Sequence, residues 1–168
     1  MSNILLGLFK DNKSAGMAVS ELKEKGYTKE ISLLAHDPKY EDPDIHEVKQ
    51  DITTGTATGA TVGAVAGALA ALFSGITAVG IPGVGLIVGG PLAVALGLVG
   101  GAAGTLAGGL VGALVDLGIN EATAQLYEER IRQGEVLIGV TTTEGTEENV
   151  RRVFTAHGAE EITTVREE

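Results

Sequence analysis

The sequence lacks cysteine and tryptophan altogether, and aromatic residues make up only 4% of its 168 residues. Without cysteine, the chain can form no disulfide, no thiolate metal site and no cysteine nucleophile. Basic residues are also scarce, because 12 Lys and Arg stand against 22 Asp and Glu, for a formal net charge of -10. Such an acidic chain does not offer the basic surface that general binding to a phosphate backbone requires. Nucleic acid is therefore not an expected partner.

Charge is absent from one long stretch of the chain. Residues 52–115 contain no Asp, Glu, Lys, Arg or His, and 17 Gly and 14 Ala make up nearly half of these 64 residues. The flanks have an ordinary polar composition, with net charges of -3 over residues 1–51 and -7 over residues 116–168. This contrast predicts an α/β domain split between the two flanks, with a hydrophobic insert between its halves.

Each flank has the pattern of a strand–helix–strand unit. Short apolar runs are typical of buried strands, and polar caps and glycines mark the ends of helices. The predicted strands are residues 4–9, 31–35, 136–140 and 162–165. The predicted helices start at Asp11, Asn120 and Thr146 and stop at Gly26, Gly134 and Gly158.

The two units are related by a pseudo-repeat. Residues 4–8 match residues 136–140 at an offset of 132, and Gly26 matches Gly158 at the same offset. Parallel strands joined through a helix favour a right-handed crossover. Two such units sharing one sheet predict an α+β fold, namely a ferredoxin-like split βαβ sandwich with an inserted glycine-rich antiparallel helical hairpin.

The insert carries glycine at every fourth position in two places. On a helix this spacing lines the glycines along one side, where another backbone can approach closely. Each helical glycine costs about 1 kcal/mol relative to alanine, so packing must offset the cost of the stripe. A flexible linker is the alternative, but apolar side chains such as Val62 and Leu69 argue against it. The predicted self-association residues are Gly55, Gly59, Gly63 and Gly67 in a helix over residues 53–74, and Gly100, Gly104, Gly108 and Gly112 in a helix over residues 92–115.

Residues 75–91 join the two predicted helices. Two prolines and six glycines make a long helix there unfavourable. The segment is still apolar, so we expect it to be buried in protein or lipid. The predicted tip of the hairpin consists of Gly80, Pro82, Gly83, Gly85 and Pro91.

Something must cover the insert, because a monomer exposing 64 uncharged residues would exceed the usual size of apolar patches. The helices are long enough to span a hydrocarbon core of about 30 Å. Two crossings would leave the α/β domain in the cytoplasm at the inner membrane; the start of the chain resembles a strand more than a secretory signal. No Trp or Tyr belt flanks the run, however, and Gly and Ala contribute little insertion energy. The alternatives are a soluble cytoplasmic assembly that buries the hairpins between subunits, and burial within one monomer.

Several segments resemble the bacterial general stress protein family, which includes heat-induced and low-temperature-induced members. The resemblance covers nearly the whole chain. It is carried by residues 7–9, Ala18, Leu22, Gly26, residues 80–85, 90–91, 112–115, 118–119, 121–122 and 127–128, and Gly134. The chain departs from the family at two places. Family members often have proline at the position of Asn120, and they often have alanine near the positions of Val88 and Gly89. The resemblance implies stress-linked expression and no known reaction.

No motif for catalysis or cofactor binding was found. The Gly83-Val84-Gly85 segment lacks the remaining features of a dinucleotide fingerprint, and Ser74 lies in no nucleophile elbow. His36 and His46 frame an acidic loop without the spacing of a calcium site, and His157 adjoins a helix stop. We therefore predict no catalytic residue, metal ligand or cofactor. The expected function is non-enzymatic self-association in or on a membrane, with a soluble scaffold or hydrophobic-ligand-binding oligomer as alternative; a small enzyme is the least favoured hypothesis.

Overall fold

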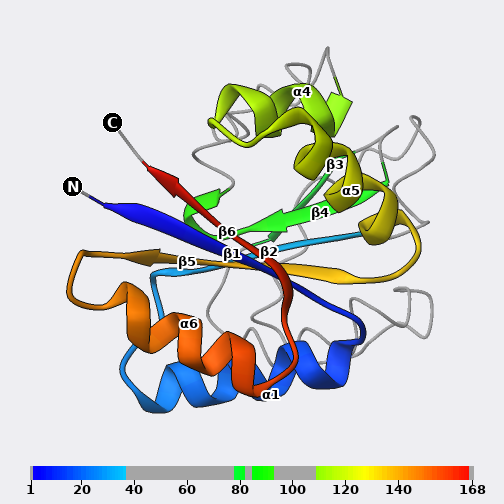
Figure 1. The fold of residues 1–168 in the computed structure, drawn as a ribbon. Coiled ribbons are helices and arrows are strands. Elements are labelled where there is room, and N and C mark those ends of the chain that lie inside the picture. The colour runs from blue at the N-terminus through cyan, green and yellow to red at the C-terminus, as the bar shows by residue number, and fades with distance from the viewer. Residues whose placement is uncertain (1, 37–77, 82–84, 93–108, 167–168) are drawn as a thin grey trace.

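The computed structural model describes residues 2–36, 78–81, 85–92 and 109–166. The chain has a mixed α+β fold, as predicted (Figure 1). The strands are β1 (Asn3–Phe9), β2 (Ile31–His36), β3 (Ala78–Ile81), β4 (Leu86–Gly89), β5 (Val136–Thr142) and β6 (Glu160–Arg166). The helices are α1 (Asn12–Glu24), α4 (Gly109–Asp116), α5 (Glu121–Arg132) and α6 (Glu147–Ala156).

All six strands form one sheet in the order β3-β4-β2-β5-β1-β6, and every neighbouring pair is antiparallel. Helices α1 and α6 lie on one face of this sheet, whereas α4 and α5 lie on the other (Figure 1). The arrangement has three layers. The sequence patterns predicted the helices of both layers but did not indicate that α4 and α5 would cover the second face.

The central strands are buried on both faces, which explains their continuous apolar sequences. In β1, Leu5 and Phe9 belong to the core under α1 and α6, and Leu6 and Leu8 belong to the core under α4 and α5. Each of these four side chains is fully buried. Two separate apolar cores therefore hold the helical layers onto the sheet.

The predicted helix ends are largely confirmed. Asp11 caps α1 by accepting a hydrogen bond from the Ser14 amide at 2.7 Å, and Asn120 caps α5 by accepting one from the Ala122 amide at 2.8 Å. The helices stop at glycines with positive φ, which a residue without Cβ adopts most readily. These are Gly26, Gly118, Gly134 and Gly158, of which Gly118 was not predicted.

The predicted cap of α6 is wrong in its chemistry. The helix starts after Thr146, as expected, but the Thr146 side chain makes no hydrogen bond to the first turn. Its hydroxyl instead accepts a hydrogen bond from the Thr143 amide at 2.9 Å. The Thr146 hydroxyl was expected to cap the first turn of α6. It binds the backbone of the preceding turn, between β5 and α6, instead.

Strands β3 and β4 differ from the sequence interpretation of residues 75–91 as the apex between two helices. They pair with each other, and β4 pairs with β2, so the segment extends the sheet. Leu86, Ile87 and Val88 are buried there in protein. The missed signal is two runs rich in β-branched residues on either side of a Pro-Gly turn, which is typical of a β-hairpin.

The end of β4 is fixed against β2. Gly90 has a φ of +77°, and a Cβ atom there would lie 2.2 Å from the Ile31 carbonyl oxygen, so no larger residue fits. Ser32, which is fully buried, accepts a hydrogen bond from the Leu92 amide at 2.9 Å. Leu92 itself is fully buried in the core under α4 and α5.

Candidate functional site

Most of the predicted self-association residues lie outside the described residues. This applies to the whole of the first glycine stripe and to Gly100, Gly104 and Gly108 of the second. Gly112 lies in α4, and a Cβ atom added to it would meet no atom within 4 Å. The described part of the chain therefore places Gly112 beside open space and does not bring the two stripes together.

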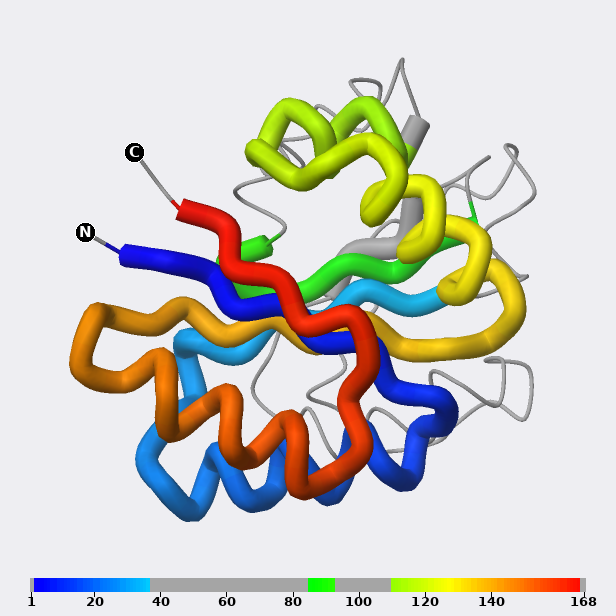
Figure 2. The backbone as a smooth tube through the Cα atoms, viewed as in Figure 1, coloured from blue at the N-terminus to red at the C-terminus, as the bar shows by residue number. Residues whose placement is uncertain are grey.

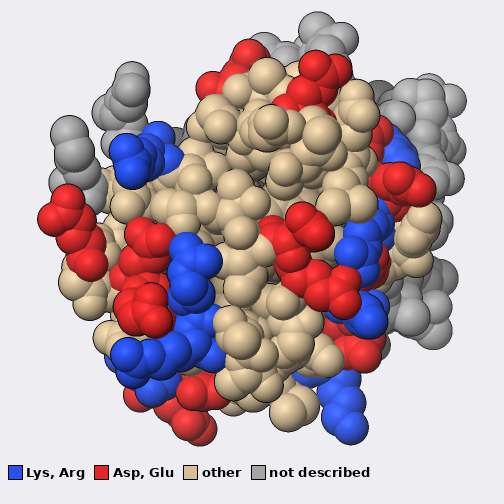
Figure 3. Space-filling view, in the orientation of Figure 1, with Lys and Arg blue, Asp and Glu red and all other residues tan. Residues whose placement is uncertain are grey.

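Helix α4 carries the last part of the charge-free run into the domain. Leu110 and Leu114 are buried in the core under α4 and α5. Val111 and Ala113 are partly buried, and Val115 is 39% exposed. Figure 3 shows a tan, uncharged patch in the upper part of the molecule with acidic side chains at its margin, while acidic and basic side chains alternate over the opposite helical layer. One side of α4 is thus core, and the other is apolar surface.

The run is attached to the domain in two places. Strands β3 and β4, over residues 78–81 and 86–89, lie in the sheet, and β4 leads to the buried Leu92; residues 110–114 return to the same core in α4. Only residues 93–109 separate Leu92 from Leu110. Both ends of the segment over residues 93–109 are therefore held in one apolar core, at Leu92 and at Leu110.

Three of the five predicted tip residues lie among the described residues, in or next to β3 and β4. Gly80 lies in β3, Gly85 directly precedes β4, and Pro91 follows Gly90. Pro82 and Gly83 lie outside the described residues. Within the described ranges, no helix combines the length and the hydropathy needed to cross a bilayer.

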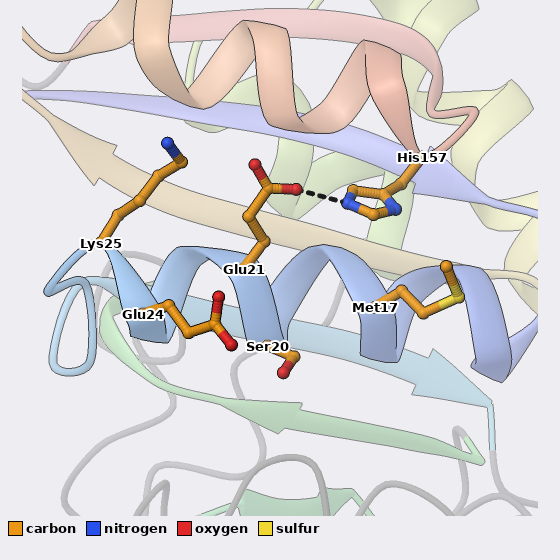
Figure 4. Close-up of a pocket in the computed structure, with 6 residues that line it drawn as sticks. All are labelled: Met17, Ser20, Glu21, Glu24, Lys25 and His157. Carbon is orange, nitrogen blue, oxygen red and sulfur yellow. Dashed lines mark hydrogen bonds and ion pairs between the residues drawn. The ribbon is translucent and has the colours of Figure 1, made fainter.

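A shallow hollow lies on the helical layer formed by α1 and α6 (Figure 4). The His157 Nε2 atom lies 2.6 Å from the Glu21 Oε2 atom and joins the end of α6 to α1. The hollow is lined by Met17, Ser20, Glu21, Glu24, Lys25 and His157. The sequence indicates His157 only as a neighbour of a helix stop, because Glu21 is 136 residues away and no spacing rule pairs the two.

The hollow does not assemble recognisable chemistry. Ser20 points away from His157, so no hydroxyl nucleophile faces the imidazole (Figure 4). No group of three or more His, Asp or Glu side chains within the described ranges is placed to hold a metal ion. The one short polar contact in this hollow joins two helices and acts as a structural tie.

A second polar group joins α5 to the ends of β1 and β6. The Arg130 guanidinium donates to Glu135 at 2.8 Å and also binds Glu160, while Lys10 lies 3.2 Å from Glu160. Arg130, followed by Lys10, lowers the pKa of the Glu160 carboxyl, and Glu135 and Glu160 raise the pKa of Arg130. These charges satisfy one another and present no unpaired group for a ligand.

Tyr127 of α5 is fully buried. Its hydroxyl also donates a hydrogen bond to the Glu161 carbonyl oxygen, which the sequence did not indicate. Burial raises the pKa of Tyr127 to about 12, so the hydroxyl stays protonated and remains a donor.

The family comparison adds one finding. The model of a family described as "Protein of unknown function (DUF1269)" matches residues 78–167. No curated protein and no solved structure matches the chain. The matched region begins at β3, so the β3–β4 hairpin, α4, α5 and the unit β5–α6–β6 all lie within it. Because this region covers more than half of the sequence, the chain belongs to the DUF1269 family.

Proposed function

We propose that this protein is a non-enzymatic, stress-associated protein that self-associates through its charge-free run, residues 52–115. The observation that carries the proposal is that 64 successive residues lack any charged side chain or histidine and include two stripes of glycine spaced by four. Part of the run, in β4 and on the inner side of α4, is covered by the domain itself. Any large apolar surface that the rest of the run forms is stable in water only when it is covered. Copies of the same chain supply a cover with matching small residues.

We propose that the domain that carries the run has a ferredoxin-like split βαβ fold. The order β2-β5-β1-β6 and the position of α1 and α6 on one face support it. In this proposal the run interrupts the two strand–helix–strand units and carries the contact between copies. The DUF1269 match names no function, and the link to stress rests on the resemblance of the sequence to general stress proteins.

The attachment of the run favours contacts between copies over crossing of a membrane. A chain that crosses a bilayer and returns to the same domain needs about 40 apolar residues, because each helical span takes about 20. Seventeen residues separate Leu92 from Leu110. Between His36 and Ala78 the charge-free part contains only residues 52–77. Neither stretch has the length for two crossings.

Association with a membrane surface is the second candidate function. The uncharged composition of residues 52–77 and the exposed apolar side of α4 near Val115 support it. In this form the α+β domain stays on the cytoplasmic side, and lipid of the inner membrane covers the apolar side chains of the run. A soluble assembly that holds a hydrophobic ligand between subunits belongs to the first candidate.

Sizing of stripe variants tests self-association. On the predicted helices, Gly63→Leu and Gly104→Leu place bulk within a stripe, whereas Ala57→Leu and Ala102→Leu place similar bulk on the opposite side. Sedimentation velocity without detergent should give an oligomer for the wild type and both controls and smaller species for both stripe variants. A wild-type monomer at all concentrations would refute the proposal.

Flotation with vesicles separates the two candidates. Untagged protein is mixed with vesicles of anionic phospholipid and centrifuged through a density gradient. An oligomer that stays at the bottom supports coverage by protein subunits. Protein that floats and resists high salt supports the membrane-surface form and removes the soluble assembly.

A further inference from the structure

The sheet ends on one side at β6, and this edge strand is irregular. Figure 2 shows β6 running beside β1. The described strands include no partner for its outer side. Leu6 pairs with Thr163 and Leu8 pairs with Glu160, so Gly7 between them opposes two residues of β6. This two-against-one pairing is a β-bulge, which bends a strand and interrupts its ladder.

The backbone at the bulge adopts an uncommon conformation. Glu161 has a φ of +50° and is the one residue other than glycine with a positive φ in the described part of the chain. Side chains with a Cβ are strained in this region, so surrounding contacts must stabilise it. The strain lies at the free edge of the sheet, at the opposite end of the strand order from β3 and β4 of the charge-free run.

Two layers hold the bulge. From one face, the buried Tyr127 of α5 donates its hydroxyl proton to the Glu161 carbonyl oxygen. From the other face, the Phe154 ring of α6 fills the space beneath Gly7, where an added Cβ would lie 2.6 Å from the Phe154 Cδ2 atom. Phe154 is itself held edge-to-face against Phe9, with ring centroids 5.5 Å apart.

Charged side chains surround the same position. Glu160 is bound by Lys10 and Arg130, and Glu161 is exposed beside it. Exposed edge strands tend to pair with strands of other molecules, and bulges and charges are the usual means of preventing this. At β6 both means occur at adjacent residues.

We propose that the bulge at Glu161, held by Tyr127, is an edge guard that prevents β6 from pairing with β6 of a second copy. It bends the strand, and the Glu161 carbonyl accepts from the Tyr127 hydroxyl and, at 3.5 Å, from the Thr163 hydroxyl, so this acceptor is not offered to an incoming strand. The guard does not depend on the charge-free run. It is a separate device that leaves self-association to other surfaces.

Hydrogen exchange of the full-length protein provides the first test. Tyr127→Phe removes only the hydroxyl and keeps the ring in the core. Loss of one buried hydrogen bond should speed exchange of the amides of residues 161–163 about tenfold. Exchange in α1 should stay unchanged, which shows that the variant is folded. Unchanged exchange at residues 161–163 overturns the role of Tyr127.

Cross-linking provides the second test, and the absence of native cysteine gives a clean background. Thr163→Cys is introduced alone and together with Tyr127→Phe, with Glu148→Cys on the exposed surface of α6 as the control for random collision. The edge guard predicts β6–β6 disulfides above the control only when Tyr127→Phe is present. Equal cross-linking in both backgrounds, or none above the control in either, contradicts it.

Glu161→Gly serves as the matched variant. Glycine accepts a positive φ without strain, so the bulge should remain and Thr163→Cys should stay uncross-linked in this background. If Glu161→Gly combined with Thr163→Cys, with Tyr127 kept, produces β6–β6 disulfides above the control, the acidic side chain rather than the bulge protects the edge, and the proposal is overturned. This variant also remains informative if Tyr127→Phe fails to fold.

Discussion

The two strand–helix–strand units, β1–α1–β2 and β5–α6–β6, begin alike and end differently. Helices α1 and α6 both stop at a glycine with positive φ, and the next residue donates its amide to the carbonyl of a buried residue, Leu22 or Phe154. Strand β2 is an interior strand with five fully buried or nearly buried residues, whereas β6 is a partly exposed edge strand.

The difference between β2 and β6 arises from the strands that the chain adds after each unit. After β2, the chain supplies the β3–β4 hairpin, and β4 pairs along β2. Among the described residues no strand comes after β6, so its outer side stays at the edge of the sheet. A local repeat therefore sets the helices and their caps, while the strand's neighbours decide whether it must be apolar throughout or protected at an edge.

The largest expected effect comes from breaking the contact between β4 and β2. Gly90→Ala places a Cβ 2.2 Å from the Ile31 carbonyl at a φ of +77°. We expect a loss of about 3 kcal/mol or more in the free energy of unfolding. Urea denaturation measures it, with Gly145→Ala as control. An added Cβ at Gly145 would meet no atom within 4 Å, and its φ is not positive, so its change to alanine should alter stability little. Equal effects of the two variants would contradict the fixed position of β4.

The next effect comes from the buried hydroxyl beneath this contact. Ser32→Ala leaves the Leu92 amide without its acceptor. An unsatisfied buried donor costs about 1–3 kcal/mol, so the midpoint of urea unfolding should fall. Ser20→Ala, on the exposed side of α1, is the matched control and should change stability little. A Ser32→Ala protein as stable as this control would show that Leu92 is not held by Ser32.

The matching caps sharpen the comparison between the two units. A Cβ added to Gly26 or Gly158 would meet no atom within 4 Å, so only the positive φ opposes alanine at either position. We expect Gly26→Ala and Gly158→Ala each to destabilise the fold by about 1 kcal/mol, and by amounts that agree closely. Thermal unfolding of the two variants measures this. A loss at one position alone would mean that the caps are not equivalent.

The smallest effect concerns acid. The Ser14 amide lowers the pKa of Asp11 below its ordinary value of 3.8, and Thr164 and Arg151 lower the pKa of Glu147 below 4.5. A carboxyl whose pKa is depressed in the folded state stabilises the fold above its ordinary pKa, and this contribution disappears as pH falls through the folded value. NMR titration should place both carboxyls below their ordinary values. Glu147→Gln should make stability less sensitive to pH below the ordinary glutamate pKa of 4.5.

The sequence predicted the elements whose signals are local. Apolar runs located β1, β2, β5 and β6, and the stop glycines at positions 26, 134 and 158 located the ends of three helices. It did not predict that β3 and β4 join the sheet. The β-branched runs on either side of Pro82 and Gly83 favour a β-hairpin, but an apolar segment rich in Gly and Pro has no clear period and also fits the apex of a helical hairpin. The pairing of β4 with β2 joins residues that are distant in the sequence, such as Leu34 and Val88.

The candidate site was predicted less completely than the fold. The contacts of Tyr127 with Glu161 and of His157 with Glu21 join residues that are distant in sequence, and no spacing rule indicates them. The glycine stripes are visible only as a pattern, and of their eight members only Gly112 lies among the described residues. Their role in self-association stays a prediction.

The central claim is that strands β3 and β4 belong to the sheet and attach the charge-free run to the domain. A disulfide between paired positions tests it most directly, since Ala35 and Ile87 are register partners in β2 and β4. Ala35→Cys combined with Ile87→Cys should form an intramolecular disulfide in mild oxidant. Ala35→Cys with Val88→Cys should not, because Val88 lies on the opposite face of the sheet. Absence of the first disulfide, or equal formation of both, would contradict the pairing of β4 with β2. The interpretation of this segment as the apex of a helical hairpin would then be favoured again.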